Sequence, residues 1–144
     1  NIDDLHERAG SKDVVHLHGE IKKVRSTSDA SLVYDLRGWE LKEGDLCEKG
    51  SQLRPHIVWF GEEVPMMDVA LSITMKADIF LVIGTSLAVY PAAGLVHYAP
   101  PHVPKFIVDP NIPQVSAVEN LHAIEAGGQK GMQLFRERLA QMSL

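Results

Sequence analysis

The stretch Ile79-Phe80-Leu81-Val82-Ile83-Gly84-Thr85-Ser86 is the part of the sequence that decides the fold. Five consecutive apolar residues are followed by a glycine and two hydroxyl side chains. This pattern is typical of a buried strand that ends in a strand-to-helix turn. Similar short runs, apolar and bounded by Gly, Pro or Asp, predict further strands at residues 14–17, 57–60, 106–108 and 122–124.

Helical periodicity separates these predicted strands. Apolar residues recur at the spacing of one helix face in two segments: Met66, Val69, Ala70 and Ile73, and then Met132, Phe135, Leu139 and Met142. A shorter helix is predicted over residues 91–98, with Pro91 in its first turn. Near-continuous apolar strands that alternate with helices predict an α/β fold with an open parallel sheet of the Rossmann-like, nucleotide-binding kind.

Residues 21–53 interrupt this alternation, because they carry charges, Ser and Gly with little sustained period. A loop of this length without structure of its own is unusual in a compact domain. We therefore expect residues 21–53 to be a small inserted subdomain, with residues 1–20 and 54–144 forming one Rossmann-like domain.

The composition excludes several functional classes. The chain has 144 residues, a net charge of −5 and only 14 Lys and Arg, which are scattered and leave no cationic stripe for nucleic acid. Its longest apolar run has five residues, far fewer than the roughly 20 of a membrane-spanning helix, so no membrane partner is expected. A single cysteine excludes a disulfide framework and fits a reducing, cytoplasmic location.

Parallel sheets bind ligands at the carboxyl ends of their strands, where turns expose backbone N–H groups. Three glycine-containing turns follow predicted strands, at residues 61–62, 84–86 and 127–128. Each of them alone could be only a tight turn.

Two histidines mark the first predicted strand. His16 and His18 are two residues apart, so a strand would place both on one face, with His18 at the carboxyl end where a general base would stand. We expect His16 to be packed in the sheet. Metal binding is the competing interpretation, but no matching carboxylate or cysteine spacing accompanies the pair, and no metal ligand is predicted. The opening segment predicts a helix start with Asp3 or Asp4 as its cap and Gly10 as its end.

Four motifs, in this order, closely resemble the catalytic domain of sirtuins, the NAD-dependent protein lysine deacylases: NIDDLHERAG at 1–10, HLHG at 16–19, LRPHIVWFGE at 53–62 and VIGTSLAVYPAAG at 82–94. The first and third are most similar to the bacterial class that resembles the desuccinylase-type sirtuins. The resemblance implies NAD as cofactor, an acyl-lysine protein or peptide as substrate, and transfer of the acyl group to ADP-ribose with release of nicotinamide.

The resemblance also implies residue roles. Asn1, Ile2 and Asp3 would line the nicotinamide pocket, and His18 would be the catalytic base, a role suited to a side chain that titrates near neutral pH. The ribose and phosphates would lie against Gly84, Thr85 and Ser86. The peptide would add as an extended strand between two backbone edges. The residues implied to flank the acyl-lysine are Val58, Phe60, Gly61, Glu62, Ala88, Val89 and Tyr90.

The sequence departs from the family at three places. Sirtuins usually carry two cysteine pairs that hold zinc, but residues 25–29 replace the first pair and only Cys47 remains near the second. We expect no zinc, and an insertion held by packing of Leu32, Val33, Tyr34, Leu36, Trp39 and Leu41. Where many relatives have an asparagine near the adenosine, this chain has Asp109, and either Asp109 or Asn111 would contact NAD. The glycine-rich loop that opens the family's domain is not found within residues 1–144.

The chain begins inside a motif and without Met, so we expect it to be the carboxyl-terminal part of a longer protein. Residues 1–144 alone should bind NAD poorly and turn it over negligibly. They should also self-associate through the exposed edge of the sheet. The alternatives are a noncatalytic NAD or ADP-ribose binding module of the same fold and an interaction domain with a vestigial site. A general base beside an apolar lysine channel favours the catalytic interpretation over these two alternatives. The residues do not decide between acetyl and succinyl groups.

Overall fold

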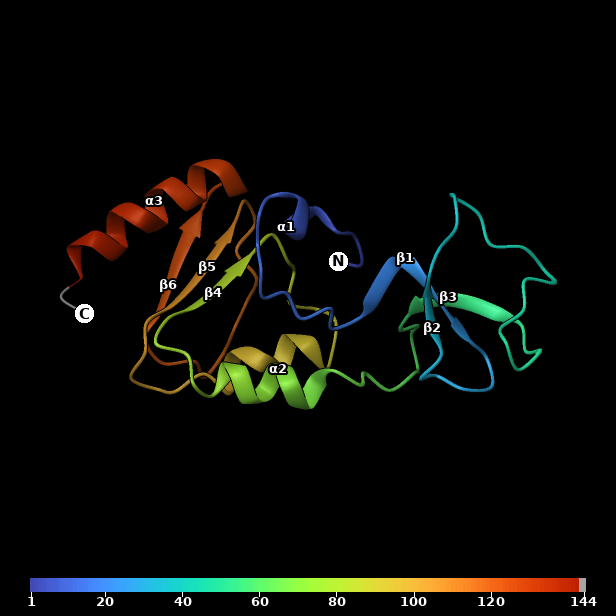
Figure 1. Ribbon diagram of the computed structural model, residues 1–144. Coiled ribbons are helices and arrows are strands. Elements are labelled where there is room, and N and C mark those ends of the chain that lie inside the picture. Colours follow the sequence, from blue (N-terminus) through green and yellow to red (C-terminus); the bar gives the residue numbers. More distant parts are fainter. Residues whose placement is uncertain (143–144) are drawn as a thin grey trace. The chain divides into compact units, whose positions relative to one another are not determined.

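The computed structural model of the protein describes residues 1–142 and divides the chain into two compact units, Asn1–Met66 and Met67–Leu144 (Figure 1).

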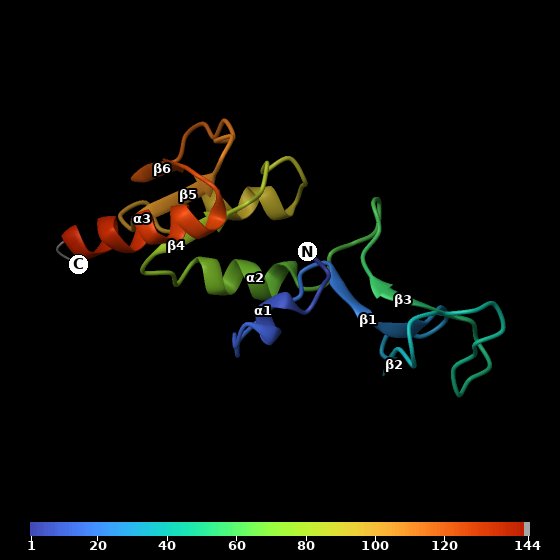
Figure 2. The ribbon, with the colours of Figure 1, turned by 90° about the horizontal axis from the view of Figure 1, so that it is seen from above.

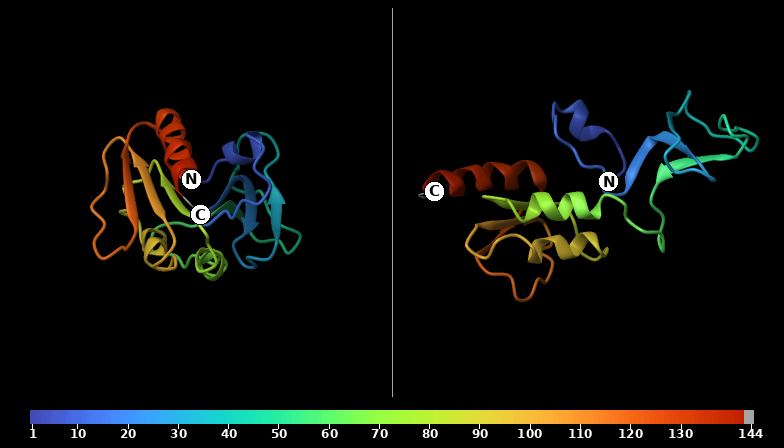
Figure 3. Two further views of the ribbon diagram at one scale, coloured as in Figure 1. Left: turned by 90° about the vertical axis from the view of Figure 1, so that its left-hand side faces the viewer. Right: turned by 60° about the horizontal axis from the view of Figure 1, so that its bottom comes forward.

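The second unit is built on a parallel sheet with the strand order β4-β5-β6. Its strands are β4 (Phe80–Ile83), β5 (Lys105–Asp109) and β6 (Leu121–Glu125), and its helical segments are α2 (Met67–Thr74), the 3₁₀ helix η1 (Ala92–His97) and α3 (Gly128–Gln141). Figure 3 shows α2 and η1 side by side, and the two elements are in contact. The strands predicted at 79–83, 106–108 and 122–124 are confirmed, as are the helices, although the one predicted over 91–98 is of the 3₁₀ type.

Apolar residues on both faces of β5 hold this unit together. Phe106 and Val108 point to one face, where the ring of Phe135 on α3 meets Phe106 edge-on at 4.9 Å between centroids. Ile107 lies one residue out of phase and is also buried, so the opposite face is covered too. A Cβ atom on Gly131 would come within 2.1 Å of Val108 Cγ1, which shows how closely α3 approaches the sheet. The predicted α/β fold with a parallel sheet covered on both faces is confirmed.

The first unit is antiparallel. After the short helix α1 (Leu5–Arg8) it forms β1 (Gly19–Ser26), β2 (Val33–Asp35) and β3 (Leu53–Ile57), in the order β2-β1-β3 (Figure 2). Most of this sheet belongs to the segment that the sequence assigned to an insertion. Strand β1 is half exposed and charged at Glu20, Lys22, Lys23 and Arg25, so it has no continuous apolar run that would mark it as a strand in the sequence.

Two predicted strands are wrong. Residues 14–17 are irregular, because their neighbouring backbone bonds close turns: Leu17 N–H donates to Val15 and Gly19 N–H to His16. The strand predicted at 57–60 instead ends at Ile57, because Arg54 and Pro55 upstream pair with β1 while residues 59–62 form a turn. His16 and His18 therefore do not share the face of a strand.

Asp3 supplies the acceptor at the start of α1. Its Oδ1 accepts the N–H of Leu5 at 3.0 Å, whereas Asp4 occupies the cap position without a side-chain cap bond. The Asp4 carboxylate instead accepts from Lys22 Nζ at 2.5 Å, and this bond lowers the pKa of Asp4. The prediction of a cap at Asp3 or Asp4 is confirmed: Asp4 occupies the cap position, and the side chain of Asp3 accepts the first N–H of the helix.

No helix within residues 1–142 is both long enough and apolar enough to cross a membrane.

Candidate functional site

A backbone bond joins two of the sequence motifs in the first unit. The N–H of Val58 donates to the carbonyl oxygen of His18 at 2.9 Å, so His18 is held at the end of β3, just ahead of the turn at residues 59–62. Gly19, next to His18, is buried with φ +86°, and a Cβ atom there would come within 2.1 Å of His56 O. Only glycine permits this approach of β1 to β3.

The opening residues are tied to the same sheet. Ile21 N–H donates to the carbonyl of Ile2 at 2.8 Å, which fixes the backbone between Asn1 and Asp3 beside the start of β1. Since the Asp3 carboxylate accepts from Leu5, one of its oxygens is already engaged within the chain. The structure thus places Ile2 beside Ile21 of β1, three residues after His18.

Carboxylates of the chain itself contact the ring of His16. Its Nε2 bonds to the Glu7 carboxylate, and Glu20 Oε1 lies 3.8 Å from the same nitrogen. This contact contributes to lowering the pKa of Glu7, after a backbone hydrogen bond of Glu7 itself. The prediction of a histidine packed in a sheet is wrong, because a carboxylate nine residues away in sequence holds the ring.

The turn that follows β3 presents an exposed aromatic side chain. Phe60 is 95% exposed, and Gly61 has φ +86°. In the same turn, the two carboxylate oxygens of Glu62 accept from Arg54, at 2.5 and 3.0 Å. The Arg54 bond, followed by the N–H of Trp59, lowers the pKa of Glu62 to about 2.

The carboxyl edge of the parallel sheet gathers the candidate nucleotide-binding residues of the second unit. Ile83 pairs with Val108 and Val108 with Ile124, so Gly84, Asp109 and Glu125 follow one another at the same edge. Gly84 has φ +62° with open space where a Cβ would stand.

Hydroxyl and carboxylate groups line this edge. Thr85 Oγ1 accepts the N–H of Leu87 at 3.2 Å, and Asp109 Oδ1 accepts the N–H of Asn111 at 2.8 Å. Thr85, Ser86 and Asn111 are exposed. Open backbone, hydroxyl groups and a carboxylate at the edge of a parallel sheet fit the phosphates and ribose hydroxyls of a dinucleotide.

Two other segments adjoin this edge. The turn at Gly127 opens α3 without a side-chain cap, beside a shallow hollow of about 440 Å³ lined by Gly127, Gly128, Gln129, Lys130 and Gln133. The loop after Ser86 exposes Ala88, Val89 and Tyr90, and Val89 O accepts the N–H of Ala93 at the start of η1.

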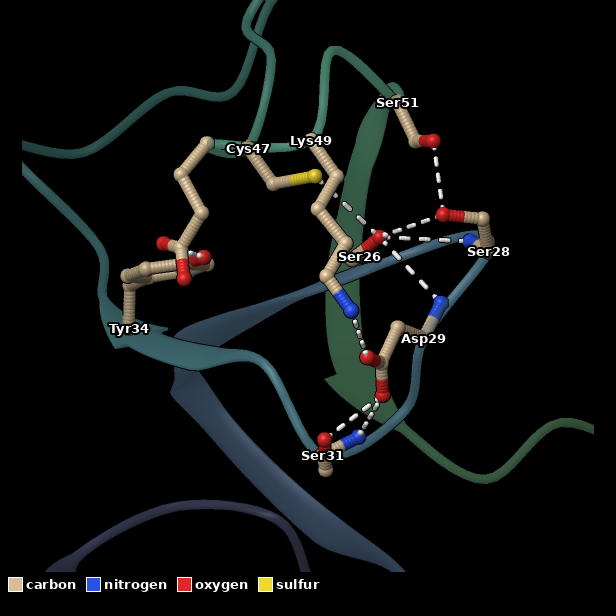
Figure 4. Close-up of polar contacts among 9 residues, drawn as sticks. Ser26, Ser28, Asp29, Ser31, Tyr34, Cys47, Lys49 and Ser51 are labelled. Atoms are coloured by element: carbon tan, nitrogen blue, oxygen red, sulfur yellow. Dashed lines mark hydrogen bonds and ion pairs between the residues drawn. The ribbon is translucent and has the colours of Figure 1, made fainter.

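The insertion is joined by polar contacts rather than by the apolar packing that the sequence predicted. None of Leu32, Val33, Tyr34, Leu36, Trp39 and Leu41 is fully buried, and Trp39 is 87% exposed. Instead, the turn at residues 26–31 is bonded to the turn at 47–52 (Figure 4). Cys47 Sγ donates to Ser26 Oγ at 3.3 Å, and Lys49 Nζ donates to Asp29 Oδ2 at 2.7 Å.

These two turns do not fit zinc. The first turn offers Ser26 and Asp29 and the second offers Cys47, and a single thiolate with a hydroxyl and a paired carboxylate is not the ligand set of a structural zinc site. Within residues 1–142, no group of three or more His, Cys, Asp or Glu side chains is arranged to hold a metal ion.

Arg54 and Lys105 each make several hydrogen bonds within the chain, and the sequence analysis did not identify either residue. Lys105 is buried, and its Nζ donates to four carbonyl oxygens, those of Pro100, Pro101, Val103 and Glu119. A basic residue beside a strand pattern ordinarily indicates a solvated strand end, so the sequence carries no signal for this burial. The motif LRPHIVWFGE contains both Arg54 and Glu62, but nothing in their spacing indicates that the two side chains meet.

The chain is similar to known proteins along most of its length. A family model described as "Sir2 family" matches residues 1–91. An NAD-dependent protein deacylase of Bacteroides thetaiotaomicron is 44% identical over 144 residues, a match that covers 96% of this chain and 62% of that protein. The chain therefore spans about three fifths of the length of this curated relative.

Two solved structures are similar to all or nearly all of the chain. A mutant Sir2 homologue in complex with ADP-ribose matches with a TM-score of 0.82 and 33% identity, over 100% of this chain and 60% of that one. A Sir2 protein with a p53 peptide and NAD⁺ matches with a TM-score of 0.77 and 29% identity, over 97% of this chain and 61% of that one.

Proposed function

The chain belongs to the Sir2 family, and from this membership we propose that the protein is an NAD-dependent protein lysine deacylase. The reaction transfers the acyl group of an acyl-lysine to ADP-ribose and releases nicotinamide. The observation that carries the proposal is the 2.9 Å bond from Val58 to His18, because it ties the candidate base to the turn proposed to bind the peptide. The similarity to a protein named NAD-dependent protein deacylase supports it.

The proposal assigns His18 as the general base, which accepts a proton from a ribose hydroxyl. Asn1, Ile2 and Asp3 form the nicotinamide pocket, where the Asp3 carboxylate accepts from the carboxamide. NAD, when bound, supplies the electrophilic ribose carbon to which the acyl oxygen bonds. A solved Sir2 homologue carries ADP-ribose, which supports a nucleotide of this class.

The residues proposed to hold the dinucleotide lie at the carboxyl edge of the parallel sheet. Gly84, Thr85 and Ser86 hold the ribose and phosphates, and Asp109 or Asn111 contacts the adenosine. The bond from the Asn111 N–H to Asp109 Oδ1 holds the carboxylate in place and leaves its other oxygen as an acceptor. Asp109 is therefore the better candidate for accepting ribose hydroxyls.

The substrate is proposed to be an acyl-lysine protein or peptide in extended form. The p53 peptide in a similar Sir2 structure supports this class of substrate. Phe60 would wall the lysine stem and keep water out, which limits simple hydrolysis of NAD. The proposed peptide-contacting residues are Val58, Phe60, Gly61, Glu62, Ala88, Val89 and Tyr90.

The proposal extends to organisation and location. Residues 1–20 and 54–144 make the partial catalytic domain and residues 21–53 the inserted module. The buried free thiol of Cys47 and the bacterial source of the similar deacylase support a bacterial cytoplasm. The 144-residue chain alone is expected to bind NAD poorly, and calorimetry against NAD tests this expectation.

The test of the function is an assay of the intact protein with an acyl-lysine peptide, with and without NAD, followed by mass spectrometry. We expect deacylated peptide and an acyl ester of ADP-ribose in equal amounts, and neither product when NAD is omitted. Deacylation without NAD would contradict the proposal. Binding of NAD without any product would favour a noncatalytic binding module.

A further inference from the structure

The turn at residues 59–62 contains a cluster of charged and aromatic groups, formed with Arg54 of β3 and Arg25 of β1. Arg54 donates to both oxygens of Glu62, at 2.5 and 3.0 Å, and also to the carbonyl of Ile57 at 3.3 Å. Its guanidinium lies 4.6 Å from the centre of the Trp59 ring. One side chain thus contacts the strand end, the aromatic ring and the carboxylate of the same turn.

Glu62 completes this arrangement. Its Oε2 accepts the N–H of Trp59 at 3.0 Å, and Arg25 of β1 approaches the same oxygen at 3.5 Å. Both carboxylate oxygens are therefore engaged by groups of the chain itself. A carboxylate held in this way is not free to pair with a charged side chain of a peptide.

The exposed side chain of the turn is placed by this cluster. The backbone of Trp59 is bonded to Glu62, and the next residue, Phe60, projects into solvent with 95% of its surface exposed. Gly61 follows with φ +86°, so the turn reverses direction between the aromatic residues and Glu62. The direction of Phe60 depends on the bonds on both sides of it.

We propose that Arg54 is a positioning residue which, through Glu62, fixes the turn so that Phe60 is presented to the acyl-lysine stem. Glu62 then serves peptide recognition through the backbone that it holds and not through its charge. This inference rests on the proposed function, since the acyl-lysine is its ligand. It predicts that the protein does not select peptides by a basic residue beside the acyl-lysine through Glu62.

The kinetic test uses the intact protein with three peptides that carry an acidic, a neutral or a basic residue next to the acyl-lysine. We expect Arg54→Gln and Glu62→Gln each to raise the peptide KM roughly fivefold for all three peptides, with the NAD KM unchanged. The double variant should be no worse than either single variant, because both remove the same contact. Lys23→Gln removes a positive charge from β1, where Lys23 pairs with Glu20, and is the matched control that should change nothing.

The contrary outcomes are specific. If Glu62→Gln raised KM for the basic peptide and lowered it for the acidic one, Glu62 would read charge and the inference would be wrong. If Arg54→Lys behaved like the wild type, the two bonds of the guanidinium to Glu62 would not be needed, and the positioning role of Arg54 would be wrong. An inactive wild-type protein would contradict the proposed function and leave the second, activity-independent measurement to decide the inference.

That measurement follows Trp59 directly in the 144-residue chain. The chain has two tryptophans, so Trp39→Phe leaves Trp59 as the only one. In this background we expect Arg54→Gln and Glu62→Gln to make Trp59 fluorescence roughly twofold more accessible to acrylamide, with a lower anisotropy, because the stacked guanidinium and the turn are released. Lys23→Gln should have no effect. Unchanged quenching in both variants, with thermal melts showing them folded, would overturn the positioning role.

Discussion

The ammonium of Lys49 lies 2.7 Å from Oδ2 of Asp29, and this ion pair joins the turn at residues 26–31 to the turn at 47–52 (Figure 4). Thr27 adds two bonds across the same gap, from its N–H and its hydroxyl to the carbonyl of Gln52, at 3.0 and 2.8 Å. Ser28 and Ser51 hydroxyls meet at 2.6 Å. Hydrogen bonds and one ion pair therefore connect the two turns.

This arrangement predicts that the purified protein contains no stoichiometric zinc and that EDTA leaves its Tm unchanged. The physical reason is that Ser26 and Asp29 cannot complete a tetrahedral thiolate site with the single thiol of Cys47. Elemental analysis and thermal melts with and without chelator provide the measurement. One zinc per chain, lost together with stability on chelation, would mean that other side chains form a metal site.

The Asp29 ion pair predicts a stability that depends on acid. Bonding to Lys49, and then to Ser31, lowers the pKa of Asp29 from 3.8 to about 2. Because the folded pKa is the lower one, the stabilisation is present above pH 3.8 and is lost as the pH falls from there towards about 2. Urea unfolding between these pH values should show this loss. Lys49→Gln should lower stability at neutral pH and flatten the acid slope, whereas an unchanged slope would contradict the pairing.

Lys105 provides a prediction for the second unit. Lys105→Met should lower the free energy of unfolding by about 2–4 kcal/mol, because the four carbonyl groups that accept from the buried ammonium lose their shared donor. Lys130→Met, at an exposed position on α3, is the control and should have little effect. Denaturant unfolding measures both. If the two variants were equally stable, the ammonium at position 105 would contribute nothing.

Gly131 tests the packing of α3 on the sheet. Gly131→Ala should destabilise by about 1–3 kcal/mol, because its Cβ would come 2.1 Å from Val108 Cγ1. Gly128→Ala, whose Cβ would meet only Ile83 Cγ2 at 4.0 Å, is the matched control. Adding Val108→Ala to the Gly131 variant should recover part of the loss. A Gly131→Ala protein as stable as the wild type would show that α3 packs differently.

The second unit could be predicted from sequence because its strands are short continuous apolar runs. The stretch around Phe106 is buried on both faces, and this burial leaves a direct signature in the sequence. Strand β1 could not be found in this way, because its lysines face solvent and its partner β3 lies some thirty residues further on.

The candidate site also has a part that the sequence predicted and a part that it did not. Motif resemblance identified His18 and Gly84, but the surroundings of a side chain depend on contacts between residues distant in the chain. His16 is held by Glu7 and not by a sheet neighbour, and Glu62 is held by Arg54 below the turn. Such pairs leave no periodicity, so they require the folded structure.

The most direct test of the account is the release of nicotinamide by the intact protein incubated with NAD and an acyl-lysine peptide. The wild type and a His102→Ala control, altered at an exposed ring, should release nicotinamide in step with deacylated peptide. His18→Ala should fold as the wild type and lose deacylation by about 10²-fold or more, since its general base is gone. A His18→Ala protein that deacylates the peptide at the wild-type rate would contradict the assignment of the catalytic base, and deacylation without nicotinamide release would contradict the proposed reaction.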